Sequence, residues 1–409
     1  MLFKISSKFQ SIFGTIISQG IILLGNLALV KIAFFKLNTN DLASFILLKR
    51  ILPIFQIIFT GGFNSLLIRS TTEWFKFQLI PFAILFSLCI YVPIIILINI
   101  IKFYYSIKVD LWYWGITIAL VSSWLSFIST YYRSNHLFLY SNFINIIFIS
   151  LIPNVSLLIT RNLKEFLQVW ILFIFITYFF FLRRIIKINF LIWFLNFKKL
   201  IKSKNLKSVL FYGYSRTFIY LLLNMINFIP VGVATLTRNQ ENIIVIGTAL
   251  FISNILFYIV TSPILLVYSS YLKHTLKVKR KDLFFKTIFM SIILLGITYI
   301  LYLKYSYFIL KLIASSKYKI IFENLQIFHV FPLINFPLAI IYTAINSMDI
   351  LRTKIIYINT LGILLIIEVA IFFLLYLLNL LNPLYIAIVH NSLLWIFQIL
   401  FLKKAYAIL

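Results

Sequence analysis

The chain has 409 residues, of which 63% are hydrophobic and 18% aromatic, while 11% are charged and the formal net charge is +28. Soluble domains are about 45–50% apolar and about 25% charged, so no soluble core could hold this much apolar surface. The composition excludes a soluble protein and predicts one that crosses a membrane many times. Cys89 is the only cysteine, which excludes an intramolecular disulfide and a cysteine metal site; we expect it to be buried, and we expect no metal and no cofactor.

Twelve stretches are long and apolar enough for membrane-spanning helices, each of which needs roughly 20 residues. Their approximate bounds are 11–33, 42–67, 78–101, 110–132, 138–160, 164–182, 209–231, 243–267, 284–303, 326–346, 355–379 and 383–402. Turn-forming residues occupy the short spacers, such as "LNTND" at 37–41. The alternation of a transmembrane β-barrel does not recur, so we predict an all-α polytopic membrane protein.

The second predicted span contains two adjacent cations, Lys49 and Arg50, in the apolar stretch "FILLKRILPIF". A charge at bilayer depth costs at least ~2.5–3.5 kcal/mol, so it normally faces protein or water. A helix turns by about 100° per residue, which places four further residues on the side of Lys49: Pro53, Gln56, Thr60 and Asn64. We therefore expect a polar stripe along this helix, which Pro53 can bend.

Three other spans repeat this pattern. The shared faces hold Thr15, Gln19 and Asn26 in the first span, Ser122, Ser126, Ser129 and Arg133 in the fourth, and Gly213, Arg216, Tyr220 and Asn227 in the seventh. Each stripe has a structural alternative, because serine rows also permit close helix packing and cations near a span end can extend to the headgroups. The sequence leaves both readings open.

A basic segment, "RRIIKINFLIWFLNFKKLIKSKNLK" at 183–207, divides the chain into two sets of six spans. We predict an N-terminal six-helix bundle at 1–182, a cytoplasmic linker at 183–208 and a C-terminal six-helix bundle at 209–409. Two such halves suggest a duplicated architecture with a pathway between them. Trp193 and several phenylalanines interleave with the lysines, which favours binding to anionic lipid over binding to nucleic acid. The alternative is a topology signal with no further function.

The distribution of the 37 lysines and arginines predicts an orientation. With the N-terminus inside, the loops and termini on the inner side carry most of them. Cytoplasmic loops are enriched in Lys and Arg, so both termini are expected in the cytoplasm.

Acidic residues are almost absent from the predicted spans. Glu368, in "LGILLIIEVAIFF", is the only acid well inside one. It is either a protonatable or ion-coupling site, or a structural residue that is protonated or paired. His329 in the tenth span and His390 in the twelfth are possible partners, although a lone histidine is more often a hydrogen-bonded packing residue.

An interior that is cationic and nearly free of carboxylates suits an anionic substrate. The cations expected to bind it are Lys49, Arg50, Arg133 and Arg216. The further polar residues expected in the same lumen are Gln19, Asn26, Gln56, Tyr220 and Asn227.

Several segments resemble polysaccharide exporters of the Wzx flippase type. "GTIISQGIILLGNLALVK" followed by "DLASFILLKRILPIFQIIFTGGFNSLLIRS" is similar to the opening of that family, whose second span ends in a glycine, a short apolar stretch and an arginine. Here these are Gly62 and Arg69. Arg133 in "YYRSN" resembles the arginine of the fourth span, and "YGYSRTFIY" resembles the start of the seventh, with Ser215 in place of a proline.

The resemblance implies membership of the multidrug/oligosaccharidyl-lipid/polysaccharide (MOP) superfamily, with two six-helix bundles, as in MATE transporters, around a cavity that opens alternately to each side. It implies transport of an undecaprenyl-diphosphate-linked oligosaccharide, an O-antigen or capsule repeat unit, to the outer leaflet of the bacterial inner membrane for lipopolysaccharide or capsule biosynthesis. Pro53, Gly62 and Arg69 would serve conformational change. The expected partners are this substrate, membrane lipids and other polysaccharide-assembly membrane proteins.

Two other functions compete with this one. A polyprenol-sugar polymerase or membrane glycosyltransferase would place catalytic acids on a sizeable outer loop, but the longest predicted outer loop, about 304–325, contains only Glu323. No paired carboxylate, metal-ligand spacing or phosphate-binding glycine loop occurs, so we expect no catalytic residue and no enzyme activity. A MATE-like drug exporter would need acids in its lumen to hold cations, and the spans contain few.

Overall fold

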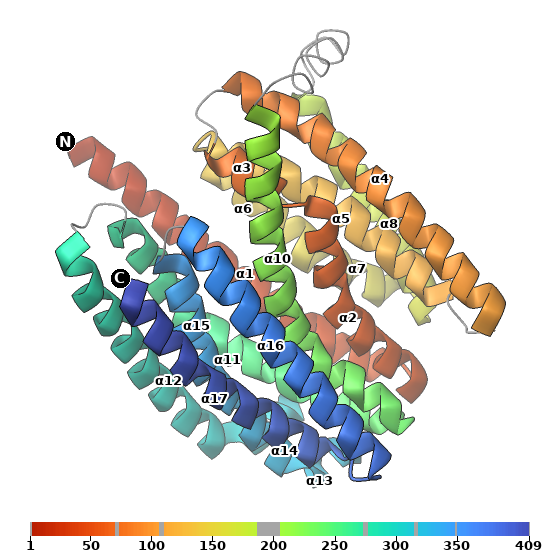
Figure 1. Ribbon diagram of the computed structural model, residues 1–409. Coiled ribbons are helices and arrows are strands. Elements are labelled where there is room, and N and C mark those ends of the chain that lie inside the picture. Colours follow the sequence, from red (N-terminus) through yellow and green to blue (C-terminus); the bar gives the residue numbers. More distant parts are fainter. Residues whose placement is uncertain are drawn as a thin grey trace. The chain divides into compact units, whose positions relative to one another are not determined.

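The computed structural model describes residues 2–69, 73–105, 110–185, 205–272, 277–314, 318–347 and 350–408. Every regular element in these ranges is a helix, which confirms the predicted all-α fold (Figure 1). Within the same ranges, eleven helices are long and apolar enough to cross a membrane, and a shorter apolar segment, Leu325–Ile341, lies at the place of the tenth predicted span. The chain is therefore a multi-pass membrane protein.

The chain folds into two compact units. The first unit comprises Met1–Leu37 and Leu48–Leu221. Its elements are α1 (Leu2–Lys36), most of α2 (Thr39–Thr60), α3 (Phe63–Arg69), α4 (Glu73–Tyr105), α5 (Asp110–Ser134), α6 (Phe138–Ile146), the π-helical turn η1 (Ile147–Leu151), α7 (Ile152–Ile159), α8 (Leu163–Ile185) and the start of α10 (Asn205–Ala234). In this unit α5 packs against α3, α4, α6 and α8, so it forms the centre of the bundle.

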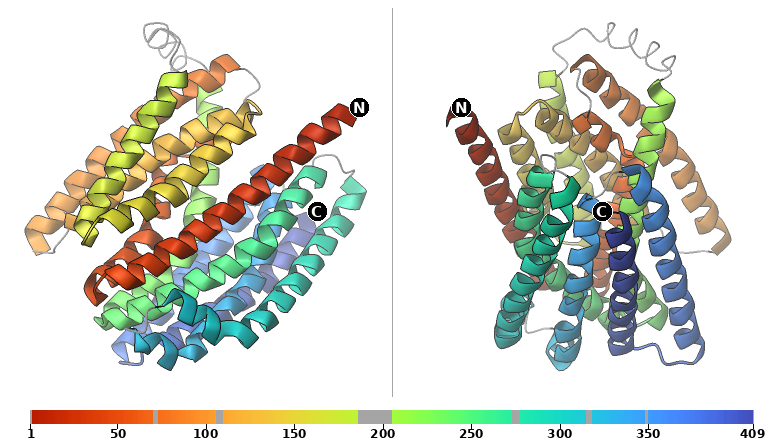
Figure 2. Two further views of the ribbon diagram at one scale, coloured as in Figure 1. Left: turned by 180° about the vertical axis from the view of Figure 1, so that it is seen from behind. Right: turned by 60° about the vertical axis from the view of Figure 1, so that its left-hand side comes forward.

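The second unit comprises Asn38–Leu47 and Leu222–Leu409. Its elements are the start of α2, the rest of α10, η2 (Thr235–Thr237), α11 (Gln240–Leu272), α12 (Lys277–Ile313), α13 (Lys319–Glu323), α14 (Leu325–Val330), η3 (Phe331–Ile334), α15 (Asn335–Ser347), α16 (Ile350–Leu377) and α17 (Pro383–Ile408). Within it α11 packs against α12 and α15, and α17 packs against α15 and α16 (Figure 2). The predicted linker falls largely on residues 186–204, outside the described ranges, so the predicted domain boundaries stay a prediction.

The second predicted span is not one continuous helix. Gly61 and Gly62 separate α2 from α3 and have φ angles of +51° and +75°, a region that favours glycine because it lacks a Cβ. The polar stripe predicted from Lys49 therefore ends with α2 at Thr60. Asn64 lies on α3 instead, where its Nδ2 donates to Ser126 Oγ of α5 at 2.8 Å.

The fifth span changes its backbone pattern in the middle. The π-helical turn Ile147–Leu151 directly precedes Ile152 and Pro153. Proline lacks an N–H and its ring crowds the carbonyl of residue i−4, and a wider turn relieves this crowding. Asn154 Nδ2 donates to the Ser150 carbonyl at 2.7 Å and to the Gly25 carbonyl of α1 at 2.8 Å, which ties the turn to the first span.

The far end of the fifth span is held by a lysine from α1. Lys36 Nζ donates to the carbonyls of Leu157 at 3.1 Å and Thr160 at 2.9 Å, and also to that of Leu158. These carbonyls lie at the C-terminal end of α7, where helical carbonyls have no partner in their own helix. A cation at this end also complements the helix dipole. The lysine therefore caps α7.

A 3₁₀ turn interrupts the α-helix of the tenth span. Pro332 lies in the 3₁₀ turn η3, between α14 and α15. Side chains from three other helices bind the carbonyls around the break: Tyr299 OH donates to His329 O at 3.0 Å, Ser253 Oγ to Phe331 O at 3.2 Å, and Asn391 Nδ2 to Val330 O at 3.2 Å. A 3₁₀ turn changes the hydrogen-bond pattern of the helix, and at membrane depth the carbonyls that lose their helical partners must be satisfied by protein or water. The turn in the tenth span is therefore stabilised by side chains of the second unit.

Cys89 lies exposed on α4, so the expectation that it is buried is wrong. A thiol behaves as a small apolar group and is compatible with a lipid-facing position.

Candidate functional site

Three of the four predicted substrate-binding cations have described side chains, and all lie in the first unit. Lys49 and Arg50 are half-buried near the middle of α2, and the Lys49 ammonium nitrogen is itself buried. Arg133 lies in the last turn of α5 and is exposed. Arg216 belongs to α10, but its side chain lies outside the described part, as does that of Arg69 on α3. Of the predicted substrate-binding cations with described side chains, Lys49 and Arg50 therefore lie nearest the middle of a span.

The predicted lumen residues differ in their surroundings. Gln19 is exposed on α1, whereas Gln56 on α2 and Tyr220 on α10 are half-buried. The amides of Asn26 and Asn227 donate back to carbonyls of their own helices, Ile22 O at 3.0 Å and Leu223 O at 3.3 Å. Pro53 lies inside α2 and is half-buried, and Gly62 lies in the turn after that helix. The roles of these residues in a lumen stay predictions.

The serine row of the fourth span holds neighbouring helices together. Ser126 Oγ accepts from Asn64 of α3, and Ser129 Oγ donates to Asn145 Oδ1 of α6 at 2.8 Å. Ser129 Oγ also lies 3.0 Å from Ser141 Oγ. Of the two readings that the sequence leaves open for this row, these contacts support helix packing for Ser126 and Ser129.

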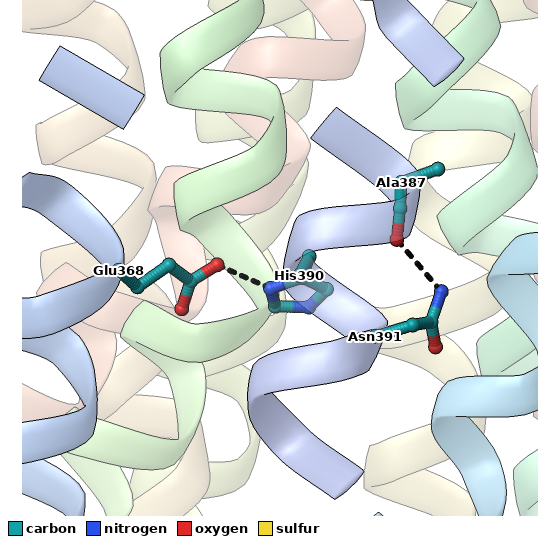
Figure 3. A network of polar contacts seen from close by, with 4 residues as sticks. All are labelled: Glu368, Ala387, His390 and Asn391. Atoms are coloured by element: carbon teal, nitrogen blue, oxygen red, sulfur yellow. Dashed lines mark hydrogen bonds and ion pairs between the residues drawn. The ribbon is translucent and has the colours of Figure 1, made fainter. Parts of the chain in front are cut away.

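A buried acid–base pair lies in the second unit (Figure 3). Glu368 of α16 and His390 of α17 are both 0% exposed, and Glu368 Oε1 forms a hydrogen bond with His390 Nδ1, which is an ion pair when the ring is protonated. His329 is engaged elsewhere, because its Nε2 lies 3.1 Å from Ser306 Oγ. Of the two possible partners for Glu368, the structure brings His390 to it.

The outer atoms of the pair are unsatisfied. Glu368 Oε2 and His390 Nε2 are buried and form no hydrogen bond with any described residue. Such buried polar atoms are rare in folded proteins and call for an explanation. An ionisable residue inside a membrane span is by default a candidate functional residue. We therefore regard Glu368 and His390 as the candidate functional pair of the second unit.

The pair lies beside the break in the tenth span. The ring of Phe331 in η3 lies 6.4 Å from that of His390, centroid to centroid. Asn391, the next residue on α17, donates to Ala387 O at 3.0 Å as well as to Val330 O. The sequence reasoning did not include Asn391. The prolines in "FHVFPLINFPL" were the signal for the break, but nothing in the sequence showed which side chains would bind it.

The described residues contain no group of three or more His, Cys, Asp or Glu side chains arranged to hold a metal ion. The chemistry available at Glu368 and His390 is proton binding and proton transfer.

No family model matches the sequence, and no curated protein is significantly similar to it. Two solved structures are similar over nearly the whole chain. One is an outward-facing multidrug resistance transporter of the MATE family and MOP superfamily, with a TM-score of 0.67, 10% identity and coverage of 98% of this chain and 95% of the other. The second is a MOP superfamily transporter from Pyrococcus furiosus described as having a binding pocket of reverse polarity, with a TM-score of 0.61, 12% identity and coverage of 98% and 96%. The chain therefore has the fold of MOP superfamily transporters.

Proposed function

We propose that this protein is a membrane exporter of the flippase type that moves an undecaprenyl-diphosphate-linked oligosaccharide from the cytoplasmic to the outer leaflet of the bacterial inner membrane. The fold supports a transporter that works by alternating access. The observation that carries the substrate class is the buried ammonium nitrogen of Lys49 near the middle of α2, with Arg50 beside it. Two adjacent cations at this depth suit an anionic headgroup.

The diphosphate headgroup matches this chemistry. Lysine and arginine bind phosphate oxygens through charge-assisted hydrogen bonds, which are stronger than neutral ones. An inside-negative membrane potential would also help an anion to move outward, by up to ~2.3 kcal/mol per charge per 100 mV. The lipid tail would remain in the bilayer while the headgroup crosses. Both termini would lie in the cytoplasm.

A MATE-like drug exporter is the second candidate, because a multidrug resistance transporter shares the fold. Such a protein would hold cationic substrates with acidic side chains. Glu368 is a buried acid in a span, but it is already paired with His390. The two candidates differ in the sign of the substrate charge.

Reconstituted vesicles separate the candidates. The purified chain is placed in vesicles that carry either a fluorescent polyprenyl-diphosphate oligosaccharide or a cationic dye, with an inside-negative potential imposed. The proposal expects transfer of the oligosaccharide between leaflets, faster when the potential is present, and no efflux of the dye. Dye efflux without movement of the lipid-linked oligosaccharide would instead establish the drug exporter.

A further inference from the structure

A carboxyl group and an imidazole face each other within two neighbouring spans of the second unit. Glu368 lies near the middle of the span Asn359–Leu377, and His390 lies in the span Pro383–Lys403. Figure 3 shows the carboxyl group reaching from α16 to the ring on α17, with Asn391 directed to the other side of that helix. Their contact is fully buried. The candidate ion-coupling residue Glu368 therefore shares its buried position with His390.

The charge of the pair depends on one proton. With one proton between Oε1 and Nδ1, the pair is neutral overall, as carboxylic acid and imidazole or as carboxylate and imidazolium. Removing that proton leaves a net buried anion, and adding a second leaves a net buried cation. A buried charge without a partner is strongly disfavoured, so the closed pair should hold one proton.

Among the described residues around the pair, the other titratable groups are bonded elsewhere or exposed. The elements packed against α17 are α11, α14, η3, α15 and α16. On these elements and α17 itself, the other described titratable side chains are His329, bonded to Ser306, and the exposed Glu241, Tyr258, Tyr376, Tyr385 and Lys403. Within the described residues, the basic side chain that meets the Glu368 carboxyl group is that of His390. Within the described part of these elements, the pair is therefore the one buried contact between an acid and a base.

The unsatisfied atoms distinguish this pair from a static structural contact. A pair retained only for packing would be expected to have its remaining polar atoms bonded, since a partly satisfied buried network is costly. Here Glu368 Oε2 and His390 Nε2 are both buried, and neither has a hydrogen-bond partner among the described residues. Each can accept or donate a proton when water enters, and the 3₁₀ turn of the tenth span lies beside His390.

We propose that Glu368 and His390 together form one proton-binding site, which holds a single proton while buried and exchanges it with water when the transporter opens. The ligand is the proton itself. This inference goes beyond the proposed function and does not depend on the substrate, so its failure would leave the flippase assignment intact.

Infrared difference spectroscopy tests the site on the full chain in lipid nanodiscs. Spectra of protein carrying ¹³C-labelled glutamate are compared between acidic and alkaline pH. We expect a carboxylic-acid C=O band from a buried glutamic acid that changes with pH and is lost in Glu368→Gln. The matched control is Glu241→Gln, which removes an exposed acid from the start of α11 and should leave the band in place. Identical difference spectra for the wild type and Glu368→Gln would overturn the proposal.

A second measurement uses only the wild-type chain and remains valid if Glu368→Gln does not fold. The chain has four histidines, so ¹⁵N-histidine labelling gives four ring environments in the NMR spectrum. Coupled groups titrate together with shared apparent midpoints. We expect the nitrogen signals of one ring to shift at the midpoint of the carboxylic-acid band, because the ring senses the proton of its partner. If no ring shares that midpoint, the two residues do not form one site.

Discussion

Gly25 on α1 lies directly against Ser150 in the π-helical turn of the fifth span. A Cβ built on Gly25 would come within 1.6 Å of Ser150 Oγ, 2.6 Å of its Cβ and 3.3 Å of its Cα. The hydroxyl could rotate away, but the Cβ and Cα of Ser150 cannot. The close approach of the two helices at this point therefore requires glycine.

Gly25→Ala is expected to destabilise the first unit by about 1–3 kcal/mol, the usual cost of overpacking a close contact. Thermal unfolding of the purified protein in detergent measures the loss. Gly20→Ala is the matched control on the same helix, because a Cβ there meets no atom within 4 Å. Ser150→Gly in the Gly25→Ala background should restore most of the stability. Equal melting temperatures for the two alanine variants would contradict the proposed contact.

Lys36→Met should loosen the end of α7 by removing its cap. A hydrogen bond to a charged group contributes about 1.5–3 kcal/mol, and exposure reduces this for Lys36, so we expect a loss of about 1–2 kcal/mol. Hydrogen exchange at the amides around Thr160 should become faster. Lys31→Met, which removes an exposed lysine from the same helix, should leave that exchange unchanged.

The contact between Ser253 and Asn335 is expected to stabilise the interrupted tenth span. Ser253 Oγ donates to Asn335 Oδ1 at 3.1 Å, and Asn335 Nδ2 donates to Ser253 O at 2.8 Å, with both residues buried. Asn335→Leu should cost about 1–3 kcal/mol because it leaves buried polar atoms unpaired. The double variant, Asn335→Leu with Ser253→Ala, should lose less stability than the sum of the losses of the two single variants.

Thermal unfolding of the two single variants and the double variant measures this coupling. Thr298→Ala serves as the control in the same unit, since Thr298 Oγ1 donates to Leu294 O of its own helix. Strict additivity of the Ser253 and Asn335 effects would show that the two residues do not act as a unit.

Lys49→Gln should lower transport of the lipid-linked oligosaccharide by about 10- to 100-fold, if one charge-assisted hydrogen bond of about 1.5–3 kcal/mol to the diphosphate is lost. Lys49→Arg keeps the charge and should retain more activity. Lys164→Gln removes an exposed cation from α8 of the same unit and should have no effect. The vesicle assay measures all three, and insertion into the membrane is checked separately. Full transport by Lys49→Gln would remove this residue from the substrate site.

Composition and hydropathy were enough to predict the all-α class and the positions of the spans, because a bilayer requires long apolar helices whatever their packing. They were not enough to predict where a helix is interrupted. Both Gly61–Gly62 and Pro332 were visible in the sequence, but apolar content does not report which backbone groups lose their helical partners. That depends on side chains from other helices, such as Ser253, which only the fold brings to the break.

The sequence was enough to single out one residue of the candidate pair, Glu368, but not to choose its partner. Glu368 was conspicuous, since it is the only acid deep inside a predicted span. Its partner depended on the register between helices, and two histidines were compatible with the sequence. The serine row of α5 was ambiguous for the same reason, because a polar face can meet water or another polar residue. Ser126 meets Asn64 and Ser129 meets Asn145, so these two serines contact polar residues of neighbouring helices.

The cap formed by Lys36 binds only main-chain oxygens. The three positions it contacts, 157, 158 and 160, can therefore change identity without weakening this attachment, provided that α7 still ends there. This capping contact between the first span and the end of the fifth therefore depends on one side chain, that of Lys36, and no change of charge at the capped positions could replace it.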